Sequence, residues 1–335
     1  MSSNVTAVSY GLKLSLPDIQ RLRSLLTAAG LGVGAETRTG DARFEVYAVD
    51  CALDSVQGAS LDASRGASQA GGADSRQDAG RDGRTADAAT AAAVAEARLD
   101  SARRALAAAG IEGVDTALVP ATLRSAPRKF LIMDVDSTLI QQEVIELLAA
   151  YAGKREEVTA VTEAAMRGEL DFAQSLHARV AVLAGLPADV VESVRAEVRL
   201  TEGAAELVAA FQAAGHAVAV VSGGFNQILR PIAEDLGLHY WIANELEIVD
   251  SALTGKVLGD VIDRAAKEKY LREWAAAEGI PMEHTIAVGD GANDLDMLGA
   301  AGIGIAFNAK PAVRAAADAA VNLPYLDAVR YIAGV

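Results

Sequence analysis

The sequence has very little cysteine and no long apolar run. Cys51 is the only cysteine in 335 residues, so no internal disulfide can form, which is typical of a reducing compartment. No apolar stretch reaches the length that a membrane-spanning helix needs. The first residues also lack a basic segment followed by an apolar run, which is the pattern of a secretory signal. We therefore expect a cytoplasmic protein without a membrane partner.

Positive charge is also scarce. Lys and Arg together number 30 against 45 Asp and Glu, a formal net charge of -15. Such a surface repels DNA, RNA and anionic lipid, so we expect no nucleic-acid partner. A small phosphorylated ligand is still compatible with this charge, provided that its pocket carries local positive charge or a metal ion.

The first 125 residues alternate strand and helix patterns in the order β-α-β-β-α-β. This order is that of the ferredoxin-like α+β unit, so we expect an accessory domain over residues 1–125. The expected elements are a strand at 4–14, a helix at 17–29, strands near 32–38 and 43–51, a helix at about 92–109 and a strand at 114–119.

A compositional break interrupts this first domain. Residues 55–90 are rich in Gly, Ala, Ser, Asp and Arg and contain no aromatic residue. A segment of this kind buries too little apolar surface to offset the entropy lost on ordering. We predict a disordered insertion at about 55–90.

From about residue 128 to the end, short apolar strands alternate with helices. Continuous apolar strands separated by helices indicate an α/β domain whose parallel, Rossmann-like sheet is covered on both faces. Residues at about 145–200 contain helical patterns without such a strand, which predicts a helical cap. Residues 246–262 alternate around Thr254-Gly255 and predict a hairpin with its turn there.

Three of the predicted strands end in loops rich in polar residues and glycine. In an open parallel sheet the loops at the carboxyl ends of the strands meet at one crevice, where ligands bind. The loops are Asp134-Val135-Asp136-Ser137-Thr138, Ser222-Gly223-Gly224 and Gly289-Asp290-Gly291-Ala292-Asn293-Asp294.

The first loop carries the most specific pattern. Asp134 and Asp136 lie two residues apart, directly after the apolar stretch FLIM, and would repel each other unless a cation were bound. Oxygen ligands favour a hard ion such as Mg²⁺. One carboxylate could attack phosphorus while the other moves the proton of the leaving group. Taken alone, the pattern is also compatible with two solvated acids in a turn.

The other loops add phosphate-binding groups. Ser222 with Gly223 and Gly224 offers a hydroxyl and unhindered backbone N–H groups, although an ordinary strand-to-helix turn has the same composition. Lys267 is expected near the start of a helix and could place its ammonium on a phosphoryl oxygen. Lys269 faces elsewhere on that helix, and a surface lysine is the alternative for either.

The ordered series of DxDxT, Ser-Gly, Lys and GDGxND resembles the haloacid dehalogenase-like phosphatases, and within them it is similar to the phosphoserine phosphatases. The resemblance covers about residues 128–325. It also draws on Glu143 and on the stretch Asp171–Leu176 with Arg179 in the predicted cap. Residues 1–125 match the amino-acid-binding (ACT-like) domain of some members only by the order of their elements.

The resemblance implies a role for each motif residue. Asp134 becomes a covalent aspartyl phosphate, and Asp136 acts as general acid and then as general base. The implied metal ligands are Asp134, the backbone carbonyl of Asp136, and Asp290. The implied phosphate- and substrate-binding residues are Ser222, Gly223, Lys267, Asn293, Glu143 and Arg179, with Asp294 in a supporting position.

The function implied is hydrolysis of O-phospho-L-serine to L-serine and phosphate, the last step of L-serine biosynthesis, with Mg²⁺ as cofactor. A related phosphatase or phosphotransferase acting on another small phosphoester is the alternative. An amino-acid-sensing regulatory protein with a vestigial phosphatase half is a rival of another class, and the full set of charged motif residues argues against it. An amino-acid ligand at the first domain and a homodimer are left open.

Overall fold

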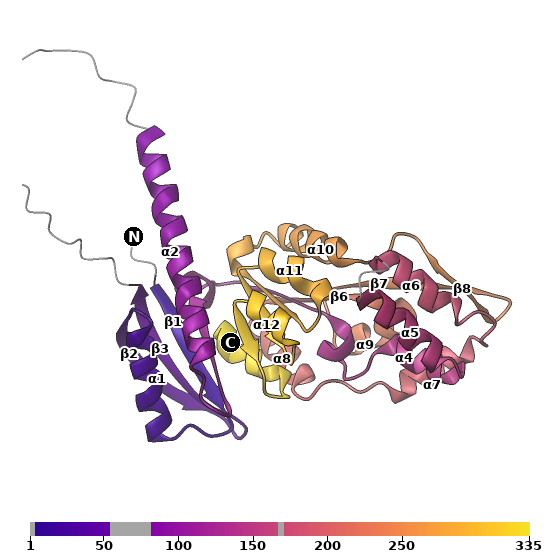
Figure 1. Ribbon diagram of the computed structural model, residues 1–335, viewed down its shortest axis with the longest axis horizontal. Helices are drawn as coiled ribbons and strands as arrows, with labels where there is room; N and C mark the ends of the chain where they lie inside the picture. Colours follow the sequence, from indigo (N-terminus) through magenta and orange to yellow (C-terminus); the bar gives the residue numbers. More distant parts are fainter. Residues whose placement is uncertain (1–3, 54–81, 167–170) are drawn as a thin grey trace, which may run out of the picture.

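A computed structural model describes residues 4–53, 82–166 and 171–335 of the chain. Two β-sheets organise these residues, one near the N-terminus and a larger one in the remainder of the chain. Along the long axis in Figure 1, the N-terminal sheet lies at one end, the larger sheet lies in the middle, and helices α4 to α7 lie at the other end.

The N-terminal sheet has four antiparallel strands in the order β2-β3-β1-β4. Its elements are β1 (Asn4–Gly11), α1 (Leu16–Ala28), β2 (Leu31–Gly40), β3 (Glu45–Leu53), α2 (Asp82–Ala108), β4 (Val114–Pro120) and the short α3 (Ala121–Arg124). Helix α1 begins at a capping box in which Ser15 and Asp18 satisfy each other's backbone N–H groups. The element order is the predicted one and is consistent with an ACT-like domain.

The predicted insertion at 55–90 falls largely on residues 54–81, which lie outside the described residues. Its last nine residues belong to helix α2, which begins at Asp82 rather than at about residue 92. The prediction of disorder therefore stays a prediction for residues 55–81.

The larger sheet has seven strands in the order β11-β10-β9-β5-β6-β7-β8. All neighbours are parallel except β7 and β8, so the predicted Rossmann-like sheet is confirmed. The strands are β5 (Phe130–Met133), β6 (Ala217–Phe225), β7 (Tyr240–Val249), β8 (Ala252–Leu258), β9 (Thr285–Gly289), β10 (Ile303–Phe307) and β11 (Ala319–Val321).

Apolar side chains bury both faces of this sheet. In β5, Phe130 and Ile132 pack with helices on one face, while Leu131 and Met133 face the opposite core, as expected from the two-residue repeat of a strand. The helices on the first face are α10 (Arg264–Ala277), α11 (Leu295–Ala300) and α12 (Pro311–Ala316), and those on the second are α8 (Ala204–Ala213), α9 (Asn226–Asp235) and α13 (Val329–Ala333).

The two sheets share a core. Phe44, in the connection between β2 and β3, is buried against the rings of Tyr325 and Tyr331, with centroid distances of 5.9 and 5.5 Å. The hydroxyl of Tyr10 donates to the carbonyl oxygen of Ala320 at 3.2 Å. The N-terminal domain is therefore docked at the β11 edge of the larger sheet.

Four helices lie between β5 and α8 and form what we call the cap: α4 (Val144–Tyr151), α5 (Arg155–Met166), α6 (Phe172–Ala181) and α7 (Asp189–Glu197). The segment between α6 and α7 is bonded to the β7–β8 hairpin. Gly185 donates to the carbonyl oxygen of Leu253, Leu253 donates to that of Leu186, and Ala188 donates to that of Ser251.

The hairpin itself turns at Asp250-Ser251, so the prediction of a turn at Thr254-Gly255 is wrong. Asp250 and Ser251 both adopt positive φ, at 50° and 59°, the conformation that a tight two-residue hairpin turn requires. Gly255 lies within β8, where an added Cβ would come within 2.8 Å of the Ala184 side chain. The lack of a side chain at Gly255 therefore allows β8 to pack closely against the cap.

Among the helices of the described residues, none is both long and apolar enough to cross a membrane.

Candidate active site

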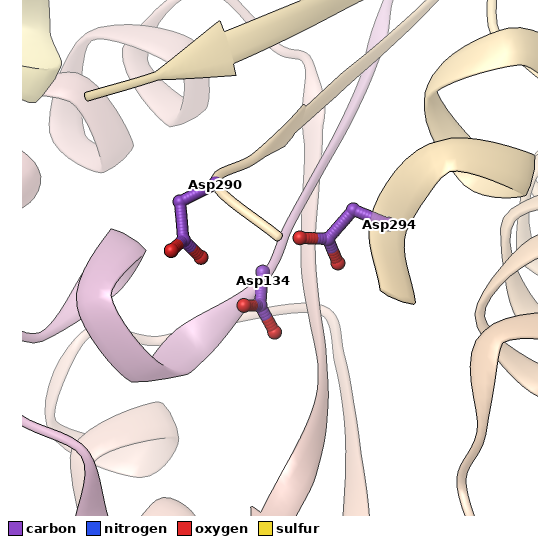
Figure 2. A group of neighbouring side chains, drawn as sticks. All are labelled: Asp134, Asp290 and Asp294. Carbon is purple, nitrogen blue, oxygen red and sulfur yellow. The ribbon is translucent and has the colours of Figure 1, made fainter. Parts of the chain in front are cut away.

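The three predicted loops converge at the carboxyl ends of β5, β6 and β9, although Ser222-Gly223-Gly224 forms the last residues of β6 rather than a loop after it. Figure 2 shows the carboxylates of Asp290 and Asp294 turned towards Asp134 from neighbouring elements. One oxygen from each of these three residues lies within 4.8 Å of the others. The motif residues are therefore neighbours in space, although more than 150 positions separate the first from the last in sequence.

Asp134 follows the fully buried strand β5 and is itself only 4% exposed. Its backbone N–H donates to the carbonyl oxygen of Val288 at 2.9 Å, which extends the pairing of β5 with β9 by one residue. Burial raises the pKa of Asp134 well above its ordinary value, the charge of Asp294 raises it further, and Lys267 partly opposes both. The single ammonium of Lys267 therefore offsets only part of the negative charge around Asp134.

Lys267 is fully buried between two of the acids. Its Nζ donates to Asp134 Oδ1 at 2.5 Å and to Asp294 Oδ1 at 2.6 Å. Burial acts to lower the pKa of Lys267, but the charges of Asp134 and Asp294 hold it above its ordinary value, so the side chain is an ammonium. The second oxygen of Asp134 accepts no hydrogen bond from any described residue.

Helix α10 places this lysine. Asp263 caps the helix by accepting from the backbone N–H of Ala266 at 2.8 Å, and Lys267 lies in the first turn that follows. Lys269 is 62% exposed and pairs loosely with Glu273. The structure therefore brings only Lys267 to the loops, as the helical spacing predicted.

The side chain of Asp136 is not part of the acidic cluster and bonds to other groups. Its Oδ1 accepts from the backbone N–H of Val144 at 3.1 Å and its Oδ2 accepts from the hydroxyl of Ser222 at 3.2 Å. Burial, together with the nearby charge of Glu143, raises the pKa of Asp136 to about 7. A carboxyl group with this pKa exchanges a proton readily near neutral pH.

The glycines of the second loop make room for these contacts. A Cβ at Gly224 would lie 2.6 Å from Asp136 Oδ2, and a Cβ at Gly223 would lie 2.9 Å from the ring of Phe172. Phe172 is the first residue of α6, so the cap reaches the Ser222–Gly224 loop directly.

Asn244 holds the segment Ser222–Gly224 in place through hydrogen bonds, and the sequence did not predict this role. It is 2% exposed. Its amide nitrogen donates to the Gly223 carbonyl oxygen at 2.8 Å, and its amide oxygen accepts from the backbone N–H of Ile262 at 2.9 Å. Asn244 thereby links the end of β6 to the segment that leads into α10 and Lys267. Only the unusual placement of a polar residue within an apolar strand could have indicated it.

Asp290 and Asp294 occupy different positions in the third loop. Asp294 is fully buried, and its oxygens accept from Lys267 and from the backbone N–H of Gly291 at 2.9 Å. Asp290 lies 3.5 Å from the hydroxyl of Thr138. Burial, and next the charges of Asp294 and Glu143, raise the pKa of Asp290 to about 6.

This cluster fits a hard divalent cation. Asp134, Asp290 and Asp294 supply only oxygen donors, which suits Mg²⁺ or a similar ion. The three carboxylates exceed the single ammonium of Lys267 by two charges when all are ionised, and a divalent ion would balance them. Because both oxygens of Asp294 already accept hydrogen bonds, Asp134 and Asp290 have the free lone pairs for coordination.

Glu143 and Arg179 lie on the cap side of the site. Glu143 accepts from the hydroxyl of Ser137 at 2.7 Å, and Ser137 adopts a positive φ of 57° within the loop turn Val135–Leu139. Arg179 is half-buried on α6, and burial lowers its pKa while the charges of Glu143 and Asp136 oppose that change. The charges of Glu143, Arg179 and Asp136 are therefore close enough to act on one another.

Asn293 is half-buried, and its side-chain oxygen lies where a Cβ at Gly291 would be only 2.1 Å away. Its side chain makes no hydrogen bond to an acid in the described parts of the chain, so the structure brings Asn293 near the site without a contact to the acidic cluster.

Comparison with known proteins gives a consistent result. Residues 131–299 match the family model of the haloacid dehalogenase-like hydrolases. A Streptomyces coelicolor protein named phosphoserine phosphatase is 60% identical over 223 residues, which cover 67% of this chain and 54% of that protein. The chain thus spans about half the length of the first curated relatives that it matches.

Two solved structures extend the comparison. One, titled as a phospho-aspartyl intermediate analogue of phosphoserine phosphatase, is 44% identical with a TM-score of 0.58, covering 60% of this chain and 97% of that one. The other is a probable phosphoserine phosphatase from Vibrio cholerae in unliganded form. It is 32% identical with a TM-score of 0.70 and covers 98% of this chain and 87% of that one.

Proposed function

The chain belongs to the haloacid dehalogenase-like hydrolases, and from that membership and the geometry of the site we propose that it is a Mg²⁺-dependent phosphatase that hydrolyses O-phospho-L-serine. The observation that carries the proposal is the pair of unlike carboxyl groups in one loop. Asp134 has one oxygen held by Lys267 and one free. Asp136, two residues later, has a pKa near 7.

In the proposed first half-reaction, the free oxygen of Asp134 attacks phosphorus. The Asp134 O–P bond forms as the bond from phosphorus to the serine oxygen breaks, and Asp136 gives its proton to that oxygen. Lys267 keeps Asp134 in place through its other oxygen. We expect the hydroxyl of Ser222, the backbone N–H of Gly223 and the ammonium of Lys267 to donate to the phosphoryl oxygens. Ser222 and Lys267 lie next to the two reacting carboxyl groups, since they donate to Asp136 and Asp134.

In the second half-reaction, Asp136 is ionised and takes a proton from water, whose oxygen attacks the aspartyl phosphate. The Asp134 O–P bond breaks, phosphate leaves and both carboxyl groups return to their first states. A Mg²⁺ ion held by Asp134, Asp290 and the backbone carbonyl of Asp136 would neutralise charge on the phosphoryl oxygens. The name of the phospho-aspartyl structure supports the same covalent course in this chain.

We propose that two charged side chains on the cap side of the site select the substrate. Phosphoserine carries an ammonium and a carboxylate beyond its phosphate. Glu143 can pair with the ammonium, and Arg179 can pair with the carboxylate through two parallel N–H donors. The names of the similar proteins support this substrate, and the reaction would complete L-serine biosynthesis.

The test is phosphate release from O-phospho-L-serine by the full chain, with and without Mg²⁺, beside a panel of other small phosphate esters. We expect release that requires Mg²⁺ and is fastest with phosphoserine. A faster rate with another ester of the panel would overturn the substrate assignment. Equal activity in metal-free buffer would overturn the metal assignment.

A further inference from the structure

A cavity of about 770 Å³ lies between the two domains, and none of its lining residues belongs to the catalytic loops. The N-terminal domain contributes residues of α1, α2 and β4, among them Leu22, Leu25 and Leu106. The larger domain contributes residues of α12, of β11 and of the segment after β11, among them Pro311 and Leu323. Its size is within the range of pockets that hold small metabolites.

Two polar contacts join the domains at this cavity. Arg103 of α2 forms an ion pair with Asp318, whose other oxygen accepts from the backbone N–H of Gly304 at 2.8 Å. Asp115 accepts from the backbone N–H and the side-chain amide of Asn322, both at 2.7 Å. Both acids of the cavity wall therefore have their oxygens already engaged, and neither is free for the ammonium of a ligand.

The arginines of the cavity wall have N–H groups without hydrogen-bond partners among the described residues. Arg104 makes no hydrogen bond or ion pair with any residue that the structure describes, although it lines the cavity. The Nε of Arg103 is buried without a partner among the same residues. Arg314 donates one N–H to Asn322 at 2.9 Å. Three arginines thus line one cavity in a chain whose formal net charge is -15, with Arg103 half-buried and Arg104 and Arg314 exposed at its solvent side.

We propose that this interdomain cavity is a second binding site, separate from the phosphatase site, for a small organic anion. Guanidinium groups bind carboxylates and phosphates through charge-assisted, often paired hydrogen bonds. The leucines of the wall would cover the aliphatic part of such a ligand, and Arg104 would be its principal charged contact. The ligand would touch both domains at once and so strengthen their docking. The inference does not depend on the reaction proposed for the acidic site.

Isothermal titration of the full chain with succinate and, separately, with inorganic phosphate tests this site and distinguishes the two head groups. The variants are Arg104→Ala and Arg104→Glu, and the matched control is Arg230→Ala, which removes an arginine that is 57% exposed on α9. Arg104 has no described partner to lose, so we expect all variants to fold, which circular dichroism would verify.

We expect saturable binding of at least one probe to the wild type and to Arg230→Ala. Arg104→Ala should weaken it at least about tenfold, the loss typical of a charged hydrogen bond, and Arg104→Glu should abolish it. If both Arg104 substitutions leave phosphate binding unchanged, that phosphate is bound at the catalytic site. If, in addition, succinate does not bind, the proposal is overturned. Failure of both probes to bind the wild type would overturn it as well.

Discussion

The substitution Asp290→Asn should stabilise the metal-free protein while it removes activity. In the folded chain the pKa of Asp290 is raised to about 6 from an ordinary value of 3.8, first by burial and then by the charges of Asp294 and Glu143. The folded state therefore holds this proton more tightly than the unfolded chain does. That contribution to stability is fully present below about pH 4 and is lost as the pH rises through about 6.

The two pKa values set the size of the effect. One pH unit corresponds to about 1.4 kcal/mol, so ionised Asp290 costs the folded state about 3 kcal/mol at neutral pH. An asparagine cannot ionise and avoids this cost. Its amide needs hydrogen bonds of its own, which offsets about 1 kcal/mol. We expect Asp290→Asn to raise the free energy of unfolding by about 2 kcal/mol at neutral pH without metal, and to change it little near pH 4.

Urea unfolding of the wild type, Asp290→Asn and the exposed control Asp235→Asn, each at several pH values, measures this difference. Millimolar Mg²⁺ should reverse the order, because a ligand that binds only the folded wild type stabilises it. Equal pH dependence of the wild type and Asp290→Asn without metal would refute the electrostatic reasoning. Equal stabilisation of both proteins by Mg²⁺ would refute the metal assignment.

Four further substitutions test the remaining assignments. Asp134→Asn should abolish phosphate release with unchanged circular dichroism, because an amide does not attack phosphorus; residual turnover in the folded variant would contradict the covalent course. Arg179→Ala and Glu143→Ala should each cost about 2–3 kcal/mol in kcat/KM with phosphoserine and much less with p-nitrophenyl phosphate, and equal losses on both substrates would make these residues structural. Asn244→Ala should lower the free energy of unfolding by about 2–4 kcal/mol, since it leaves two buried backbone groups unpaired; a change below about 0.5 kcal/mol in urea unfolding would disprove its linking role.

The convergence of the catalytic loops was predictable from the sequence. Apolar strands such as β5 and β9 end in polar loops, and parallel strands carry their carboxyl ends to the same edge of a sheet. The order of the motifs then predicted that Asp134, Lys267 and Asp290 lie close together. In the structure Asp134 contacts Lys267, and its carboxylate lies within 4.8 Å of that of Asp290.

Features that depend on tertiary packing could not be predicted from the sequence. Thr254-Gly255 has the composition of a turn, but that glycine allows β8 to approach α6, and the turn falls on Asp250-Ser251 without any glycine. Asn244 carries no motif, because its role depends on two backbone groups brought to it by separate segments. Contacts between distant parts of the chain leave no local pattern, so only the folded structure could reveal them.

The bonds between the hairpin and the cap also restrict how the cap can move. A body joined to its neighbour by two linkers can rotate about the line between them. Here a third attachment, made by the hydrogen bonds of Gly185, Leu253 and Ala188, ties the cap to the edge of the larger sheet. Rigid rotation of the whole cap would break these bonds. The cap is therefore better suited to internal rearrangement of its helices than to swinging open as a lid.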